Sequence, residues 1–278
     1  MIRAGTLFTM CALLSILTVC APQVASQPPA PALVPTEAVP SETPSPSSTP
    51  LATVTLSPSA TPTPLGGGSG EIVFYSNRRG TNNDVYVTQV ANRSVALLAQ
   101  GESGYFSGPF SPDGSRMLFT GFGLTHSYVG IMNADGSAQT DLTKLPQVDD
   151  AFPAWSPDGK QIAFTSRRDG NNEIYVMNAD GSKPTRLTSN SSDDFAPVWS
   201  PDGSRIAFVS DRDNRAGVYS LYVMMADGKG VSRVTEGAGS AYSPDWSPSG
   251  SSILYRSVRE GQADIYVVGV DGKGERNL

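Results

Sequence analysis

Cysteine is confined to the start of the chain, at Cys11 and Cys20, and no cysteine follows in the 278 residues. A disulfide framework, a thiol nucleophile and a Cys-ligated metal are therefore excluded beyond residue 20. His126 is the only histidine. A Ser-His-Asp triad would need it, but no Gly-x-Ser-x-Gly motif accompanies it, so we interpret His126 as an exposed loop residue and expect no enzyme.

Charged residues are scarce, at 17% of the chain, and acidic residues outnumber basic ones by 26 to 20. The net charge of −6 repels phosphate backbones, so nucleic acid is not an expected partner. No complete ligand spacing such as an EF-hand loop is present, so we expect no metal and no cofactor, with Ca²⁺ as the one ion left open. By contrast, 28 glycines and 22 prolines suit many short strands and tight turns.

Residues 1–20 have the composition of a signal peptide or a lipoprotein signal. Arg3 supplies a positive start, and residues 4–19 are mostly apolar. The run Leu17-Thr18-Val19-Cys20 resembles a bacterial lipobox, which makes Cys20 the lipidation candidate, although Val19 departs from the usual Gly, Ala or Ser. Cleavage at Val24-Ala25-Ser26 and an uncleaved anchor are the alternatives. All three interpretations predict an extracytoplasmic protein, lipid-anchored to a membrane or secreted or periplasmic.

Residues 21–70 form a linker rich in Pro, Ser and Thr. Twelve of the 22 prolines lie in this segment, and its only charged side chains are those of Glu37 and Glu42. Such a segment has too few large apolar side chains to offset the entropy lost on ordering. We therefore predict a disordered spacer that holds residues 71–278 away from a membrane.

A repeat of 44 to 47 residues follows the linker. Its marker is a four-residue turn, found at Ser111-Pro112-Asp113-Gly114, Ser156-Pro157-Asp158-Gly159, Ser200-Pro201-Asp202-Gly203 and, altered, Ser247-Pro248-Ser249-Gly250. Four strands of five or six residues with their turns need a repeat of this length. In the copy that begins at residue 152, strands are predicted at 152–156, 161–165, 173–177 and 185–188.

Three tryptophans, Trp155, Trp199 and Trp246, precede the turn at one repeat position, where the remaining copy has Phe110. An identical position in successive repeats favours packing between repeats over ligand binding. The fold class is therefore all-β: a β-propeller of about five four-stranded blades, with a six-bladed or incompletely closed ring as the alternative.

These residues resemble the propeller repeats of the TolB family. The resemblance is carried by Trp155 to Gly159, by Ile162 to Phe164, by Ile174 to Gly181 and by Arg186 to Thr188. It covers about residues 71–278, and it implies a propeller without the N-terminal domain of periplasmic TolB. The same repeats occur in the propellers of prolyl-oligopeptidase-like peptidases, so the resemblance is specific for the fold and not for a function.

The sequence does not decide how the ring of blades closes. The chain enters the first repeat at a second strand, around Ile72, so five blades lack one first strand. The first blade has three strands, or the ring is open, or a stretch such as residues 51–56 completes it. An open ring exposes a strand edge, which can dock a partner.

Charged residues are predicted to gather on the face where first strands begin. The candidates for a binding face there are Asp149, Asp150, Asp193, Asp194, Arg167 and Arg212. The aspartates occupy matching positions in adjacent repeats, so they could bind a cation or a basic segment of a partner. The alternative is that they cap turns and pair with arginines.

The expected function is that of a non-catalytic interaction module in the cell envelope. It would be a monomer, tethered to a membrane only by a lipid or signal anchor, that binds a protein or peptide. The alternative is an enzyme or ligand-binding propeller that acts on a saccharide or peptide at the channel mouth, with Asp149 and Asp193 as paired acids.

Overall fold

The computed structural model describes residues 71–80, 82–100, 104–213, 218–236 and 239–278. The predicted signal, the linker and the lipidation candidate Cys20 lie outside the described residues. Within them the fold is all-β, with no helix. In particular, no helix there is long and apolar enough to cross a membrane.

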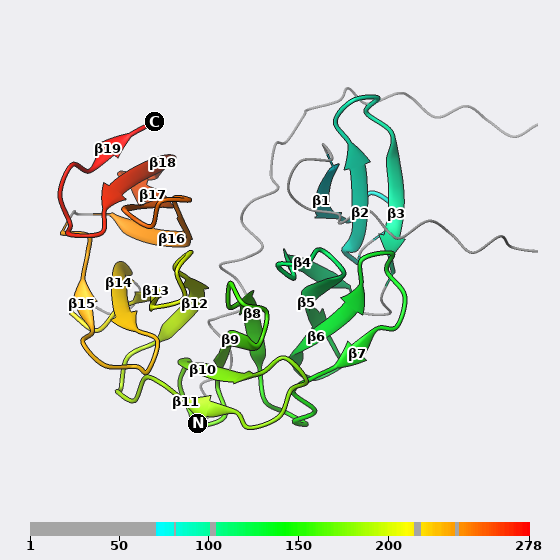
Figure 1. Cartoon of the computed structure of the whole chain (residues 1–278), viewed down its shortest axis with the longest axis horizontal. Coiled ribbons are helices and arrows are strands. Elements are labelled where there is room, and N and C mark those ends of the chain that lie inside the picture. The colour runs from blue at the N-terminus through cyan, green and yellow to red at the C-terminus, as the bar shows by residue number, and fades with distance from the viewer. Residues whose placement is uncertain (1–70, 81, 101–103, 214–217, 237–238) are drawn as a thin grey trace, which may run out of the picture. The chain divides into compact units, whose positions relative to one another are not determined.

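The described strands form five antiparallel meanders, and Figure 1 follows them by colour along the chain. Sheet 1 has three strands: β1 (Glu71–Ser76), β2 (Asp84–Gln89) and β3 (Val95–Ala99). Sheet 2 consists of β4 (Tyr105–Phe110), β5 (Arg116–Phe122), β6 (Ser127–Asn133) and β7 (Thr140–Asp141). Sheet 3 consists of β8 (Asp150–Trp155), β9 (Gln161–Ser166), β10 (Glu173–Asn178) and β11 (Thr185–Arg186).

Sheet 4 consists of β12 (Asp194–Trp199), β13 (Arg205–Ser210), β14 (Ser220–Met225) and β15 (Ser232–Arg233). Sheet 5 consists of β16 (Ser240–Trp246), β17 (Ser252–Arg259), β18 (Gln262–Gly269) and β19 (Arg276–Asn277). The predicted five-bladed propeller of four-stranded sheets is confirmed, and the described part of the first blade has three strands. The fourth strand of sheet 3 ends before the predicted Thr188, because the Thr188 hydroxyl, rather than a strand carbonyl, accepts the N–H of Ile174 at 2.9 Å.

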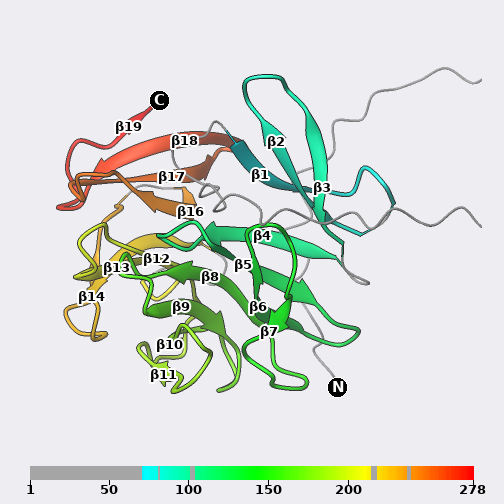
Figure 2. The same cartoon turned by 45° about the vertical axis from the view of Figure 1, so that its right-hand side comes forward.

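Neighbouring sheets pack face to face in chain order. The first strands β4, β8, β12 and β16 lie against one another, and they are therefore the inner strands. Figure 2 shows β5 and β6 of one sheet next to β8 and β9 of the following one. Trp155 confirms the predicted role of the repeated tryptophans, since it packs on Leu118 and Val129 of the preceding sheet. Trp246 likewise packs on Ala207 and Leu221.

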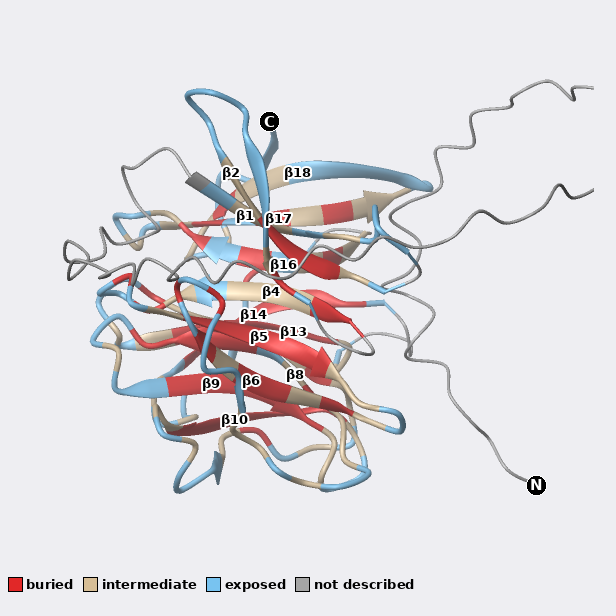
Figure 3. Ribbon diagram, turned by 90° about the vertical axis from the view of Figure 1, so that its right-hand side faces the viewer, coloured by how far each residue is buried: buried red, intermediate tan, exposed pale blue. Residues whose placement is uncertain are grey.

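The two end sheets expose apolar side chains at repeat positions where the middle sheets bury theirs. Ile72 is 54% exposed, whereas Ile162 and Ile206 at the same position are fully buried. At the other end Ile265 is 44% exposed, although its counterpart Leu221 is fully buried. In Figure 3 the strands of the middle sheets are largely buried, whereas β18 is mostly exposed or intermediate. The outer faces of sheets 1 and 5 therefore lack the cover that a neighbouring blade gives to the others.

The Ser-Pro-Asp-Gly turn joins each inner strand to the second strand of its sheet. In the first of these turns the Ser111 hydroxyl donates to Asp113 Oδ1 at 2.5 Å and accepts the N–H of Arg116 at 3.0 Å. Asp113 Oδ1 also accepts the N–H of Ser115 at 3.1 Å. Gly114 takes a φ of 69°, a conformation that a residue with a Cβ adopts only with strain. The serine, aspartate and glycine thus each meet a geometric need of this turn, although the fourth turn keeps a φ of 68° at Gly250 with Ser249 in place of the aspartate.

We predict that these turns are sensitive to acid. Hydrogen bonds from Ser111 and from Ser200 hold the pKa of Asp113 and of Asp202 at about 2, below the ordinary aspartate pKa of about 3.9. The folded pKa lies below the unfolded one, so the stabilisation is complete above about pH 4 and is lost as the pH falls towards 2. Carboxyl-carbon NMR titration should give both midpoints near 2. Replacing Ser111→Ala should raise the pKa of Asp113 alone, and unchanged midpoints would contradict this origin.

Candidate functional site

One side of the sheets, where the inner strands begin, holds the predicted binding residues. We call it the mouth face. It consists of Asp149, Phe152, Asp193, Phe195, Asp211, Tyr219, Tyr242, Arg167 and Arg256. The side chains of Asp149 and Asp193 each accept a hydrogen bond from the preceding sheet. Asp149 Oδ1 accepts the N–H of Ser127 at 2.9 Å, and Asp193 Oδ1 accepts the N–H of Asn172 at 2.9 Å.

These two aspartates therefore join neighbouring sheets. Ser127 begins the third strand of sheet 2, and Asn172 precedes that of sheet 3, so both bonds cross from one sheet to the next. In the next sheet the matching Ser240 hydroxyl accepts the N–H of Tyr219 at 3.3 Å. One carboxylate oxygen of each aspartate is thus engaged in a hydrogen bond to the neighbouring sheet.

Asp150 and Asp194 lie deeper. Their side chains are 1% and 0% exposed, and burial raises the pKa of each, against the lowering effect of serine and arginine partners. Arg168 Nη2 lies 3.4 Å from Asp150 Oδ2, and Arg212 Nη2 lies 2.7 Å from Asp194 Oδ2. Such a buried pair needs both partners, because either one alone is an uncompensated charge.

The arginine in each pair belongs to a Ser-x-Arg sequence at the end of the second strand. Arg212 stacks over Phe208 and Tyr222, with its guanidinium carbon 5.1 and 5.0 Å from the ring centroids. Its Nε donates to Ser210 Oγ at 3.0 Å. Arg168 is held in the same way in sheet 3. Of the predicted face residues, Asp150, Asp194 and Arg212 are thus engaged inside the sheets.

Two other sheets have the same arginine but not the same aspartate partner. In sheet 5 the position of the aspartate is Ala241, and Arg259 pairs instead with Glu275 at 2.9 Å. In sheet 1 Arg78 stacks over Phe74 and Tyr86 at 5.0 and 4.6 Å, but it has no carboxylate partner among the described residues, where this sheet has no inner strand.

We predict that removal of Arg212 is far costlier than removal of Arg78. Arg212→Ala strands the buried Asp194 carboxylate and should lower the free energy of unfolding by about 3–5 kcal/mol. Arg78→Ala, the matched control, loses exposed cation–π contacts and a hydrogen bond from Nε to Ser76 Oγ, together about 1–2 kcal/mol. Urea unfolding measures both. The double variant Asp194→Ala/Arg212→Ala should recover part of the loss, and equal losses for the two single variants would be inconsistent with the pair.

Aromatic rings form the apolar part of the mouth face, and the sequence prediction missed them. Phe195 lies 6.2 Å from Phe152 and 4.8 Å from Tyr219, and Tyr219 lies 5.8 Å from Tyr242, all between ring centroids. A signal was present in the repeat, since Phe106, Phe195 and Tyr242 share the second position of their inner strands, allowing for the longer β16. Burial, with Asp193 and Asp211 nearby, raises the pKa of Tyr219 to about 12.

A β-bulge in β8 turns the side chain of Phe152 out of the sheet towards solvent. The pairing of β8 with β9 shifts between Ala151 and Ala154, and Phe152 takes a φ of 53°. The equivalent Ala196 and Ser243 take φ values of 54° and 50°, so the conformation belongs to the repeat. The N–H of Phe152 donates to Thr120 Oγ1 of the preceding sheet at 3.2 Å, which helps to fix it. A phenyl ring here is 39% exposed, where the other sheets carry small side chains.

Two arginines complete the mouth face. The side chain of Arg167 is half-buried and has no hydrogen-bond or ion-pair partner among the described residues. Arg256 lies over Tyr242, 5.6 Å from its ring centroid. No group of three or more His, Cys, Asp and Glu side chains that could hold a metal gathers in the described part of the chain. The mouth face therefore offers aromatic surface, aspartates anchored by one oxygen, and two cations.

Comparison with known proteins places this architecture in a family. The model of the TolB beta propeller domain matches residues 69–221. The chain belongs to the TolB β-propeller family. A solved structure of a putative TolB from Agrobacterium tumefaciens is 26% identical, with a TM-score of 0.63, and the match covers 70% of this chain and 73% of that chain.

Two further solved structures share the fold. TolB from Acinetobacter baumannii is 24% identical with a TM-score of 0.64, and the match covers 75% of this chain and 51% of that protein, about half its length. An oligogalacturonate lyase in complex with manganese is 15% identical with a TM-score of 0.56, covering 76% of this chain and 62% of that one. No curated protein matches the chain. The TolB-like propeller is thus the repeat architecture that the sequence predicted.

Proposed function

We propose that this TolB-like propeller is a non-catalytic interaction module that binds a protein or peptide at the mouth face. The observation that carries the proposal is the row of rings from Phe152 to Tyr242 beside Asp193 and Asp211. Partly exposed aromatic surface next to charged groups is the composition of protein-binding sites. The likeness to TolB structures supports the same class of function.

The partner we propose presents basic side chains. Asp193 and Asp211 are half-buried carboxylates that flank Tyr219, and the rings supply faces on which a cation can stack. The anchoring bond to Asn172 holds Asp193 in place before a partner arrives, which reduces the ordering cost of binding. No cofactor is needed for this function.

A catalytic role at the mouth face is less well supported. Asp149 and Asp193, the acids considered for glycoside chemistry, each accept a backbone N–H from the adjacent part of the fold. Both acids therefore already hold neighbouring sheets together, and this structural role accounts for their repeated position. The lyase likeness, at 15% identity, concerns the fold alone.

We predict that removing an aromatic ring and two carboxylate charges from the mouth face weakens binding of the partner protein. Phe152→Ala/Asp193→Asn/Asp211→Asn keeps the hydrogen-bond acceptors, and alanine is tolerated at the bulge, as Ala196 shows. In cross-linked pull-downs from envelope extract, partner recovery should fall about tenfold or more. The control Asp180→Asn/Asp227→Asn removes two charges from exposed turns on the opposite face and should leave recovery unchanged. Identical partner profiles for both variants would remove the mouth face from consideration.

We also propose that the protein is exported and lipid-anchored through Cys20, with residues 21–70 as a spacer. Mass spectrometry of the mature chain after growth with labelled lipid should find a lipidated N-terminal Cys20. The variant Cys20→Ala should lose the label, whereas the control Cys11→Ala should keep it. A mature N-terminus near Ser26, or a chain that retains Met1, would argue for a secreted or signal-anchored form instead.

A further inference from the structure

The turns on the face opposite the mouth stack in a row. A Cβ placed on Gly203 would lie 3.3 Å from Pro157 of the preceding turn, and one on Gly250 would lie 3.6 Å from Pro201. Each turn therefore rests against the proline of the turn before it. The tryptophan that ends each inner strand lies directly before its turn, so three indoles follow the row.

Two of the three indoles are covered by an arginine of the preceding sheet. The guanidinium carbon of Arg116 lies 5.1 Å from the ring centroid of Trp155, and that of Arg205 lies 5.0 Å from Trp246. Arg205 Nη2 also donates to the carbonyl of Gly250 in the adjoining turn at 3.3 Å. Both tryptophans are buried, at 7% and 8% exposure. The repeat thus places a guanidinium over the indole face at two positions, and at one of them the guanidinium also binds a turn carbonyl.

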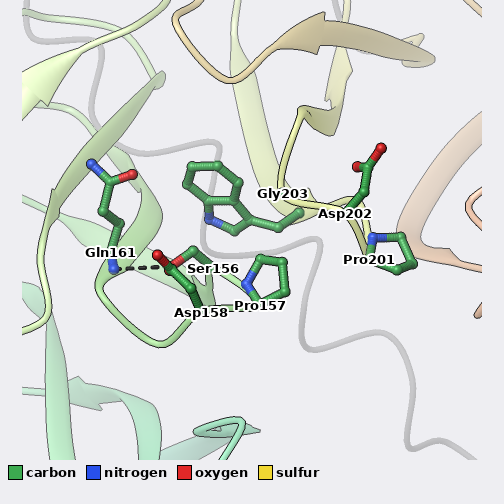
Figure 4. Close-up of a pocket in the computed structure, with 8 residues that line it drawn as sticks. Ser156, Pro157, Asp158, Gln161, Pro201, Asp202 and Gly203 are labelled. Carbon is green, nitrogen blue, oxygen red and sulfur yellow. Dashed lines mark hydrogen bonds between the residues drawn. The ribbon is translucent and has the colours of Figure 1, made fainter.

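At the third indole the chain does not supply that arginine. The residue that corresponds to Arg116 and Arg205 is Gln161, which has a shorter and neutral side chain. A hollow of about 380 Å³ remains there, lined by Ser156, Pro157, Asp158, Gln161, Trp199, Pro201, Asp202 and Gly203. Figure 4 shows Pro157, Asp158 and Gln161 on one side of it and Pro201 and Asp202 on the other. Trp199 is more exposed than its two counterparts.

The hollow is acidic at neutral pH. The Ser156 hydroxyl lowers the pKa of Asp158, and the Ser200 hydroxyl holds that of Asp202 at about 2. Lys160 lies 3.5 Å from Asp158, but both side chains are more than half exposed, so the pair is screened by water. Asp202 has no ion-pair partner among the described residues. Two carboxylates therefore flank an indole face with no cation over it.

We propose that this hollow is a binding site for the guanidinium of an arginine on a partner protein. The two sister positions show what fits, because each has a guanidinium about 5 Å above the indole, and at Trp246 that guanidinium also donates to a turn carbonyl. The residue equivalent to Gly250 is Gly203, which is among the residues that line the hollow. Asp158 and Asp202 add the opposite charge, which steers a cationic group towards the site. This site lies on the face opposite the mouth face. It is independent of the function proposed for the mouth face.

The three indole N–H signals of the full-length chain can test this site directly, since the chain has three tryptophans, one at each position. Acetyl-arginine amide should produce a saturable ¹⁵N–¹H shift that is largest for Trp199, whose signal is assigned from Trp199→Phe. Neutral acetyl-citrulline amide, the matched probe, should not produce it. A response of equal size at all three indoles, or an equal response to citrulline or to acetyl-lysine amide, overturns the assignment.

A substitution that completes the repeat gives a second test. Gln161→Arg should place a guanidinium over Trp199, abolish the response to acetyl-arginine amide and raise the melting temperature by about 1–4 °C. Gln161→Ala leaves the hollow open and should keep the response. If Gln161→Arg folds and still responds like the wild type, the proposal is wrong.

Discussion

The packing of one sheet face to face on the next is the interaction on which the other features depend. A four-stranded meander has two apolar faces and cannot bury both alone. The aspartate bonds from Asp149 and Asp193, the arginine stacks and the row of turns all act across or beside this contact. The mouth face and the hollow at Trp199 lie at the two ends of the same sheet interfaces, where the repeat pattern meets solvent.

Much of the fold followed from local chemistry in the sequence. The Ser-Pro-Asp-Gly turns fixed the strand order, because each residue type answers one requirement of the turn. The strand bounds differ from the prediction by one or two residues where side chains replace backbone partners, as Thr188 does at the end of β11. That sheet 1 has no described inner strand agrees with the sequence, in which the first repeat starts at its second strand, around Ile72. The exposure of the end faces could not be predicted in this way, because it depends on which sheets lie side by side.

The candidate site could be predicted only in part. Spacing located Asp149 and Asp193, but periodicity does not reveal that a carboxylate reaches across to another sheet. Phe152 was overlooked, although the proline that follows it, repeated at Pro197 and Pro244, is a residue that strands carry at bulges. The replacement of arginine by Gln161 is readable once the repeats are superposed, yet its meaning depends on seeing a guanidinium over the other two indoles.

The uncovered end faces bear on how the fold opens. Extensive contacts between sheets join neighbours in chain order, so the coupling between distant sheets is indirect. Sheets 3 and 4 are held on both faces, whereas Ile72 and Ile265 mark faces held on one side only. Amide hydrogen exchange should then be graded along the chain, slowest in β9 and β13 and fastest in the end sheets. A partner that covered an end face would convert this graded opening into a single cooperative transition.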